Sequence, residues 1–204
     1  MRILIAGVLL SVLLIPQFAD AQTTVDPVDR AEILQSTAAA TPTLGAYSSY
    51  VQNPNAGTEY RLFFEFDLSA YGSQGSVVFN FSAYEVNGTG TIYLRAMNAG
   101  EDGSITASDW YNLGATLWTG TITSSSQSFS VPVTAWFNNR AGGFGGLALT
   151  AAPGTVGVVS TNAGSGQLAL TAVPEPATFA LFGLGLGGLF LGHRMRRRRK
   201  QKTA

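Results

Sequence analysis

The chain has 204 residues and a formal net charge of zero at pH 7, but its charges are unevenly distributed. Seven of the twelve basic residues lie from Arg194 onward, whereas residues 22–173 hold four arginines, ten carboxylates and no lysine, a net charge of about −6. Such a charge argues against nucleic acid or anionic lipid as partners of this region, because those ligands need clustered positive charge. The chain has no cysteine and its one histidine is His193. Residues 22–173 therefore lack thiolate metal ligands and the Ser-His-Asp and Cys-His nucleophiles.

The N-terminus has the three parts of a secretory signal peptide. Arg2 is the basic start, residues 3–15 are an apolar core, and Ala19-Asp20-Ala21 is a small-x-small cleavage site. We expect a signal helix within residues 1–21, export by the Sec machinery, and cleavage by signal peptidase before Gln22. An uncleaved membrane anchor is the less favoured alternative, because the apolar core is short and a cleavage site follows it.

Residues 44–172 show the pattern of short β-strands separated by Gly, Ser, Asn or Pro. In residues 60–67 large apolar side chains stand at the even positions and mainly charged ones at the odd positions, which predicts one buried and one solvent-exposed strand face. Further strands are expected at residues 76–86, 91–97, 115–122, 128–133, 145–151, 155–160 and 167–173. Without a convincing long helix, this pattern indicates an all-β fold, an antiparallel β-sandwich of jelly-roll type.

Two segments have ambiguous signals. Residues 22–43 form an N-terminal segment in which residues 28–34 fit either a helical turn or an edge strand. Residues 134–138 fit either one turn of helix or a continuation of the strand before them.

The middle of the chain resembles a known class of secreted module. Residues 60–68 read Tyr-Arg-Leu-Phe-Phe-Glu-Phe-Asp-Leu, Asp109-Trp110 stands in a later loop, and residues 131–134 read Val-Pro-Val-Thr. In these residues the chain resembles the jelly-roll modules called DNRLRE-type domains, although the defining motif of that family is not intact here. The resemblance implies a carbohydrate-binding-like sandwich of a surface protein rather than a catalytic site.

Residues 98–109 fit part of the spacing of a twelve-residue calcium loop, with Gly103 at the position of the turn glycine. Five residues take ligand positions of that loop: Asn98, Asp102, Ser104, Thr106 and Asp109. The third position is Gly100, Asp replaces the usual bidentate Glu, and flanking helices are missing. A weak calcium site and an ordinary Asp-Gly turn both stay open, and no other cofactor is expected.

Aromatic and acidic side chains suggest two further kinds of site. Trp110 and Tyr111 lie in a polar loop and are the candidates for stacking on a sugar ring. Glu65 and Asp67 share a strand face, with side chains about 7 Å apart by strand spacing, which fits the carboxylate pair of a glycoside hydrolase. Their expected place on a solvent-exposed face near Arg61 favours a structural role, so we expect no catalytic residue.

The C-terminal segment combines an extended motif, an apolar run and a basic cluster. Val173-Pro174-Glu175-Pro176 precedes residues 177–192, which carry no charge. A run of this length makes a helix of roughly 24 Å, slightly shorter than a hydrocarbon core of about 30 Å. We therefore expect a single transmembrane helix at residues 177–192, with the basic tail at residues 194–202 on the cytoplasmic side. The residues of the basic cluster are Arg194, Arg196, Arg197, Arg198, Arg199 and Lys200.

In these three parts, residues 173–202 resemble the PEP-CTERM sorting signal, with a plain C-terminal anchor as the alternative. The resemblance implies transient anchoring in the inner membrane of a Gram-negative bacterium and processing by an exosortase, a membrane transpeptidase. It further implies a non-catalytic protein of the cell surface or extracellular matrix, which we expect to be associated with exopolysaccharide or biofilm. A carbohydrate-binding module with a defined glycan and, less favoured, a secreted carboxylate-dependent glycoside hydrolase remain alternatives.

Overall fold

The structure, a computed structural model, describes residues 22–36, 41–45, 51–53, 57–83, 90–98, 100–123, 127–155 and 166–171. The chain divides into two units, Met1–Ala172 and Val173–Ala204, and every described residue belongs to the first. The expected signal helix and the expected transmembrane helix lie outside the described residues. Within the described ranges, no helix has both the length and the apolar character needed to cross a membrane.

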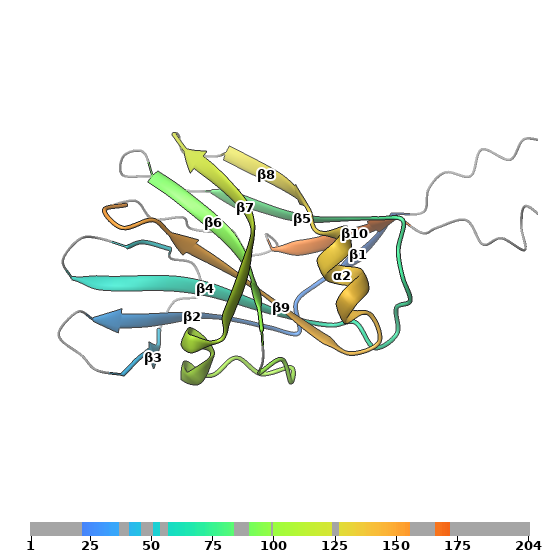
Figure 1. Cartoon of the computed structure of the whole chain (residues 1–204), viewed down its shortest axis with the longest axis horizontal. Helices are drawn as coiled ribbons and strands as arrows, with labels where there is room; N and C mark the ends of the chain where they lie inside the picture. Colours follow the sequence, from blue (N-terminus) through green and yellow to red (C-terminus); the bar gives the residue numbers. More distant parts are fainter. Residues whose placement is uncertain are drawn as a thin grey trace, which may run out of the picture. The chain divides into compact units, whose positions relative to one another are not determined.

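Two antiparallel β-sheets form the body of the described region (Figure 1). The smaller sheet has four strands in the spatial order β1 (Gln22–Val25), β10 (Gln167–Thr171), β5 (Ser76–Ala83) and β8 (Gln127–Pro132). The larger sheet has six, in the order β3 (Thr43–Leu44), β2 (Asp29–Ser36), β4 (Thr58–Asp67), β9 (Phe144–Ala151), β6 (Gly90–Met97) and β7 (Leu113–Ile122). Two short helices complete the described elements, the 3-10 helix η1 (Ala107–Tyr111) and α2 (Thr134–Arg140). The expected all-β antiparallel sandwich is confirmed.

The chain passes repeatedly from one sheet to the other. From β4 to β10 it changes sheet at every step except the one from β6 to β7. As a result, β9 lies between β4 and β6, and β10 lies between β1 and β5. Such crossing connections between two sheets are those of a jelly roll. Gln22 of β1 is paired with Thr171 of β10, so the first and last described residues stand opposite each other.

The main hydrophobic core fills the space between the two sheets. Leu62, Phe64 and Phe66 of β4 are fully buried there, as the alternation of the sequence predicts. The ring centroids of Phe64 and Phe79, which come from opposite sheets, lie 5.2 Å apart in an edge-to-face arrangement. Burial of each such ring contributes on the order of 2–3 kcal/mol to folding, which matters in a chain without disulfides.

The outer face of the larger sheet is partly covered, which corrects an expectation from the sequence. Residues of the loop 98–112, which includes η1, pack on this face and close a second apolar cluster. Its members are Ile33, Phe63, Met97, Ile105, Trp110 and Ala148. Glu65, expected on a solvent-exposed face, is 0% exposed, because this stretch of β4 is buried on both sides.

Residues 134–140 form a helix rather than a strand continuation. Trp136 and Phe137 of α2 are buried in the main core. The hydroxyl of Thr134 accepts the backbone N–H of Val77 at 2.9 Å, which ties the start of the helix to β5.

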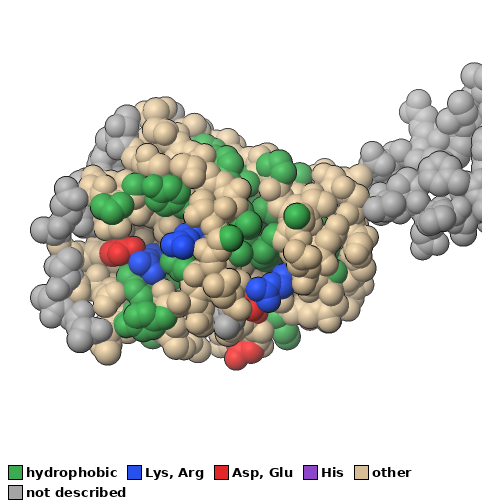
Figure 2. All heavy atoms as spheres, in the orientation of Figure 1, with side chains coloured by type: hydrophobic (Ala, Val, Ile, Leu, Met, Phe, Trp, Pro, Cys, Tyr) green, Lys and Arg blue, Asp and Glu red, His purple; other side chains and the backbone are tan. Residues whose placement is uncertain are grey.

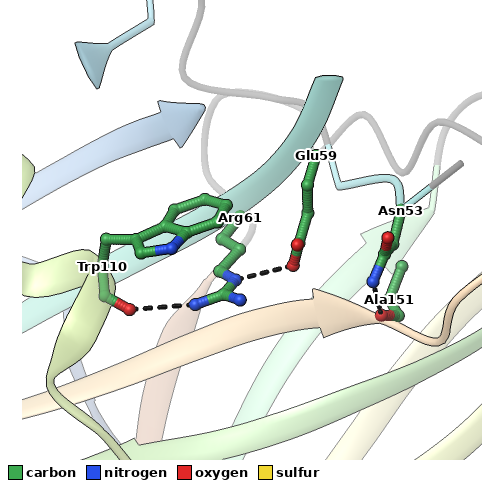
Figure 3. Close-up of polar contacts among 5 residues, drawn as sticks. All are labelled: Asn53, Glu59, Arg61, Trp110 and Ala151. Carbon is green, nitrogen blue, oxygen red and sulfur yellow. Dashed lines mark hydrogen bonds and ion pairs between the residues drawn. The ribbon is translucent and has the colours of Figure 1, made fainter. Parts of the chain in front are cut away.

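The N-terminal segment is made of strands. β2 is paired with β4 along its whole length and with the short β3 on its other side, so it is not the edge strand that the sequence allowed. Of the strand expected at residues 155–160, only Thr155 is described, in an isolated bridge with Asn53. Asn53 also donates through its side chain to the Ala151 carbonyl at 3.3 Å, at the end of β9 (Figure 3).

Candidate functional site

An arginine held between an indole ring and a carboxylate lies on the outer face of the larger sheet (Figure 3). The Arg61 guanidinium carbon is 3.7 Å from the centroid of the Trp110 ring. Arg61 Nε donates to Glu59 Oε1 at 2.7 Å, and Nη1 donates to the Trp110 carbonyl oxygen at 2.9 Å. Nη2 has no partner among the described residues. The Arg61 and Glu59 side chains are 18% and 22% exposed, so the pair is fixed in place and still reaches water.

Local sequence explains why these groups meet. Glu59 and Arg61 are two residues apart on β4 and therefore point to the same side of the strand. Trp110 comes from η1, whose first turn is fixed because the backbone N–H of Thr106 donates to Asp109 Oδ2 at 2.7 Å. A cation–π contact of this kind contributes about 0.5–2 kcal/mol. The contact therefore orients the guanidinium and holds the loop at the same time.

Further polar side chains lie on the same side of the larger sheet. Ile92 and Leu94 of β6 point into the main core. Tyr93 and Arg95 alternate with them along the strand and therefore point outward. We use the name open face for the outward surface formed by Glu59, Arg61, Tyr93, Arg95, Thr119 and Thr121. In this set Thr119 and Thr121 are exposed and the other four are partly buried.

The strand register gives the layout of the open face. Tyr93 is paired with Thr119 of β7 on one side and with Thr150 of β9 on the other. Continuing the β4–β9 register by one residue puts Arg61 opposite Thr150. Arg61 and Tyr93 thus stand in one row, about 10 Å apart at the backbone, which is two strand spacings. Arg95 donates through Nε and Nη2 to the Gly114 carbonyl, at 3.2 and 2.9 Å.

Charged side chains are sparse on this side of the protein. Figure 2 shows a surface that is mainly tan and green, with blue and red groups touching at two places. Two ion pairs occur among the described residues, Glu59 with Arg61 and Glu101 with Arg140. Arg95 has no carboxylate partner among them.

Four successive backbone N–H groups of the loop each donate to a different carboxylate. The bonds are Gly103 to Glu65 Oε2 at 2.6 Å, Ser104 to Asp102 Oδ1 at 3.0 Å, Ile105 to Asp29 Oδ2 at 2.7 Å and Thr106 to Asp109 Oδ2 at 2.7 Å. Asp29 and Glu65 are paired in register on β2 and β4. These two carboxylates therefore tie the loop to the sheet, while the other two shape the loop itself.

The residues expected to ligate calcium lie in this loop: Asn98, Asp102, Ser104, Thr106 and Asp109. Both oxygens of Asp109 already accept hydrogen bonds, since Oδ1 takes the side-chain amide of Asn112 at 3.0 Å. Across the described ranges, no three His, Cys, Asp or Glu side chains come together in a way that could hold a metal ion. Calcium binding stays a prediction, and it would require these hydrogen bonds to be replaced.

Glu65 and Asp67, the carboxylate pair of the sequence analysis, have pKa values displaced in opposite directions. Burial raises the pKa of Glu65, the Gly103 N–H opposes that rise, and two nearby carboxylates add to it. Hydrogen bonds from the Ser69 hydroxyl and backbone N–H lower the pKa of Asp67. Opposed displacements mark the acid–base pairs of hydrolases. Glu65, however, is 0% exposed, and its Oε1 is buried with no hydrogen-bond partner among the described residues. A substrate has no access to this carboxyl group.

The two aromatic residues expected to stack on sugar lie in different environments. Trp110 is 5% exposed and packs in the second apolar cluster, with Arg61 over its ring. This burial contradicts the expected stacking role of Trp110, because its ring has no open face. Tyr111, the next residue, is 65% exposed.

Sequence reasoning missed Arg61, Tyr93 and Arg95 as members of one surface. Alternation in the two strands gives the side to which each residue points, and that signal was present. Alternation does not tell which strands lie next to each other in the sheet. Here β9, which comes much later in the chain, lies between β4 and β6.

The residues expected to direct processing lie outside the described residues, except Gln22, which begins β1. They are Ala19 and Ala21 at the signal cleavage site, Val173, Pro174, Glu175 and Pro176 of the sorting motif, and the basic cluster from Arg194 to Lys200.

Comparisons with known proteins give one sequence match and several loose structural ones. No curated protein sequence matches the chain. A CBM35 module from Cellvibrio japonicus Abf62 is 9% identical over 75% of this chain and 95% of its own, with a TM-score of 0.33. The xylan-binding module CBM15 is 9% identical over 77% of this chain and 99% of its own, with a TM-score of 0.35. A CBM4 module is 9% identical over 76% of this chain and 85% of its own, with a TM-score of 0.30. Because these TM-scores are low, the ligands of these modules are not assigned to this chain.

The sequence match concerns the C-terminal segment. The family described as the PEP-CTERM protein-sorting motif matches residues 172–200. This range includes the Val-Pro-Glu-Pro run, the apolar segment and the basic cluster. The chain thus carries a PEP-CTERM sorting motif at its C-terminal end.

Proposed function

We propose that this is a non-catalytic surface or extracellular-matrix protein, sorted by an exosortase-type transpeptidase and associated with exopolysaccharide in a biofilm. Signal peptidase removes residues 1–21 during export, and the exosortase then cuts at the motif that begins with Val173. The helix at residues 177–192 holds the protein in the inner membrane between the two cuts. The β-sandwich is the part that remains outside the cell.

One observation carries the sorting part of this proposal, the match of residues 172–200 to the PEP-CTERM motif. The order of its parts has a physical purpose. Proline disfavours helix, so from the sequence we expect Pro174 and Pro176 to make the entrance of the motif accessible to a protease. The uncharged run can enter the bilayer, and the arginines behind it stop further transfer.

Two features support a role without catalysis. Residues 22–173 contain neither histidine nor cysteine, so the common nucleophile–base pairs cannot be built. Glu65, a carboxyl group whose pKa is raised by burial, is enclosed beneath the loop 98–112.

The sorting proposal is tested by the intact mass of the surface product. The chain is expressed in a bacterium that has an exosortase and in the same strain without it. With the enzyme, we expect a product that begins at Gln22 and ends near Val173–Pro176. A variant with Glu175→Ala and Pro176→Ala is the matched control and should keep its tail in both strains. Surface protein that retains Arg196–Lys200 in the strain with the enzyme would refute the proposal.

The alternative function is a carbohydrate-binding module with a defined glycan. The open face supports it, because it presents hydroxyl groups, a tyrosine and a fixed ion pair on a regular sheet surface. Binding to one purified polysaccharide, with a measurable affinity and no turnover, distinguishes this alternative from a general matrix role. Release of reducing ends that is lost in Glu65→Gln would instead support a hydrolase.

A further inference from the structure

We infer that the open face is a binding site for an uncharged polysaccharide, in which the Glu59–Arg61 pair hydrogen-bonds neighbouring sugar hydroxyls and Tyr93 packs against a sugar ring. This inference rests on the proposed association with polysaccharide and gives it a location and a ligand class. Trp110 supports the site by stacking with Arg61 and does not itself contact the glycan.

The first step concerns hydrogen bonding at the ion pair. Arg61 uses Nε and Nη1 within the protein, and Nη2 has no partner among the described residues. Glu59 uses Oε1, which leaves Oε2 without a described partner. A donor and an acceptor therefore stand side by side and partly exposed. Adjacent hydroxyl groups of a sugar can each donate and accept, so one pair of hydroxyls satisfies both atoms.

The second step concerns order before binding. Both ends of the guanidinium are fixed, by Glu59 and by the Trp110 carbonyl, and its plane is fixed by the Trp110 ring. A long side chain that is already ordered loses little freedom when a ligand binds, which removes a cost of about 0.5–1.5 kcal/mol for each such side chain. This is a role for Trp110 that its 5% exposure allows.

The third step concerns the size of the surface. Tyr93 stands in the row of Arg61, about 10 Å away by two strand spacings, and its hydroxyl has no partner among the described residues. Thr119 is paired with Tyr93, and Thr121 follows on the same side of β7. An extended chain of sugar units can lie along this row, with an aromatic ring for its apolar side and hydroxyls for its edges.

The fourth step concerns the charge of the ligand. Glu59 neutralises Arg61, so Arg95 is the one unbalanced charge of the six residues. Residues 22–173 together carry about −6, which repels polyanions. An uncharged polysaccharide avoids this repulsion, and its binding should change little with salt because no counterions are released.

The test measures binding of the full chain in detergent to soluble polysaccharides by affinity electrophoresis. The neutral probes are hydroxyethylcellulose, arabinoxylan, galactomannan and pullulan, and the anionic probes are carboxymethylcellulose and polygalacturonate. We expect binding to at least one neutral probe, unchanged within about twofold between 50 and 500 mM salt, and weaker binding to the anionic probes. Hydroxyethylcellulose and carboxymethylcellulose share a backbone, so they isolate the effect of charge.

Two pairs of variants locate the site. Tyr93→Ala and Arg61→Lys should each weaken binding about tenfold, a typical effect of losing a well-placed contact. Tyr111→Ala and Arg140→Lys are the matched controls and should bind like the wild type, because they lie outside the open face. Tyr93 belongs to neither apolar cluster, so Tyr93→Ala tests the site even if Arg61→Lys unfolds.

Three outcomes would overturn the inference. They are no binding to any neutral probe, stronger binding to the anionic probes, or an equal loss in Tyr93→Ala and Tyr111→Ala. In the last case association with polysaccharide stands and only its location is wrong. Sorting is measured separately by intact mass, so its success or failure does not depend on this result.

Discussion

Replacement of Trp110 by alanine separates the two roles considered for this residue, a stacking surface for sugar and an internal anchor. The indole packs with Phe63, Met97 and Ile33 in the second apolar cluster and is 5% exposed. A sugar-stacking residue can be removed with little effect on stability, whereas an anchor cannot. The free energy of unfolding therefore decides between them.

The expected cost follows from the contacts that disappear. Truncating a buried tryptophan to alanine costs about 3–5 kcal/mol, and the lower value applies where the surroundings can collapse. The loop above the indole can move inward, so about 3 kcal/mol is expected from packing. Loss of the Arg61 stack adds about 0.5–1 kcal/mol. We expect a destabilisation of about 3.5–4 kcal/mol in total.

Urea denaturation followed by circular dichroism measures this difference by linear extrapolation. Tyr111→Ala is the matched control, and its 65% exposed ring predicts a change within about 0.5 kcal/mol. Hydrogen exchange provides a local measurement, because the amides of residues 103–106 all donate to carboxylates and should exchange faster once the loop loses its anchor. Equal stability of the two variants, with unchanged exchange at residues 103–106, would refute the anchoring role.

Two further predictions concern buried positions. Burial raises the pKa of Glu65, so the folded protein holds the proton of this carboxyl group more tightly than the unfolded chain does. The protonated group therefore contributes to the free energy of unfolding near pH 4.5 and below, and this contribution is lost as the pH rises through the pKa of the folded state. The stability of the wild type relative to Glu65→Gln should therefore rise as pH falls from 7 towards 4.5 in parallel urea titrations, and a fall would contradict the buried carboxylate. Gly166 has a φ of +95°, and an added Cβ would lie 2.2 Å from the buried Phe64 ring. Gly166→Ala should cost about 2 kcal/mol or more in thermal unfolding, while Gly142→Ala, with φ of +90° and open space around it, should cost only about 1 kcal/mol of backbone strain. Equal costs would show that the contact with Phe64 is relieved.

Strand positions were the part of the fold most accessible from sequence. Period-two alternation around Phe64 predicted a strand and its buried side, since a side chain's direction in a strand depends only on its parity. Strands were also expected around Phe79 and Leu94, where the structure has β5 and β6. Glu65 shows the limit of this reasoning. Parity gives the side to which a residue points, but what covers that side depends on a loop more than thirty residues later in the chain.

The candidate site was accessible only in part for a related reason. Trp110 was noticed because a tryptophan in a polar loop is unusual, yet the polar groups of that loop bond to the protein rather than to water. Arg61 and Tyr93 were not linked, because their row passes through β9. Strand order in a jelly roll is set by non-local pairing, which no short window of sequence encodes.

The pairing of Gln22 with Thr171 bears on how the sandwich withstands two tethers. Paired residues in antiparallel strands are about 5 Å apart, so the proposed signal peptide before Gln22 and the proposed membrane helix after Thr171 would be attached at neighbouring points of the sheet. A pull on both would open β1 from β10 one hydrogen bond at a time instead of stretching the whole sandwich lengthwise. In the proposed processing each cut would relieve that pull and leave both strands joined, so neither cut would unfold the sandwich.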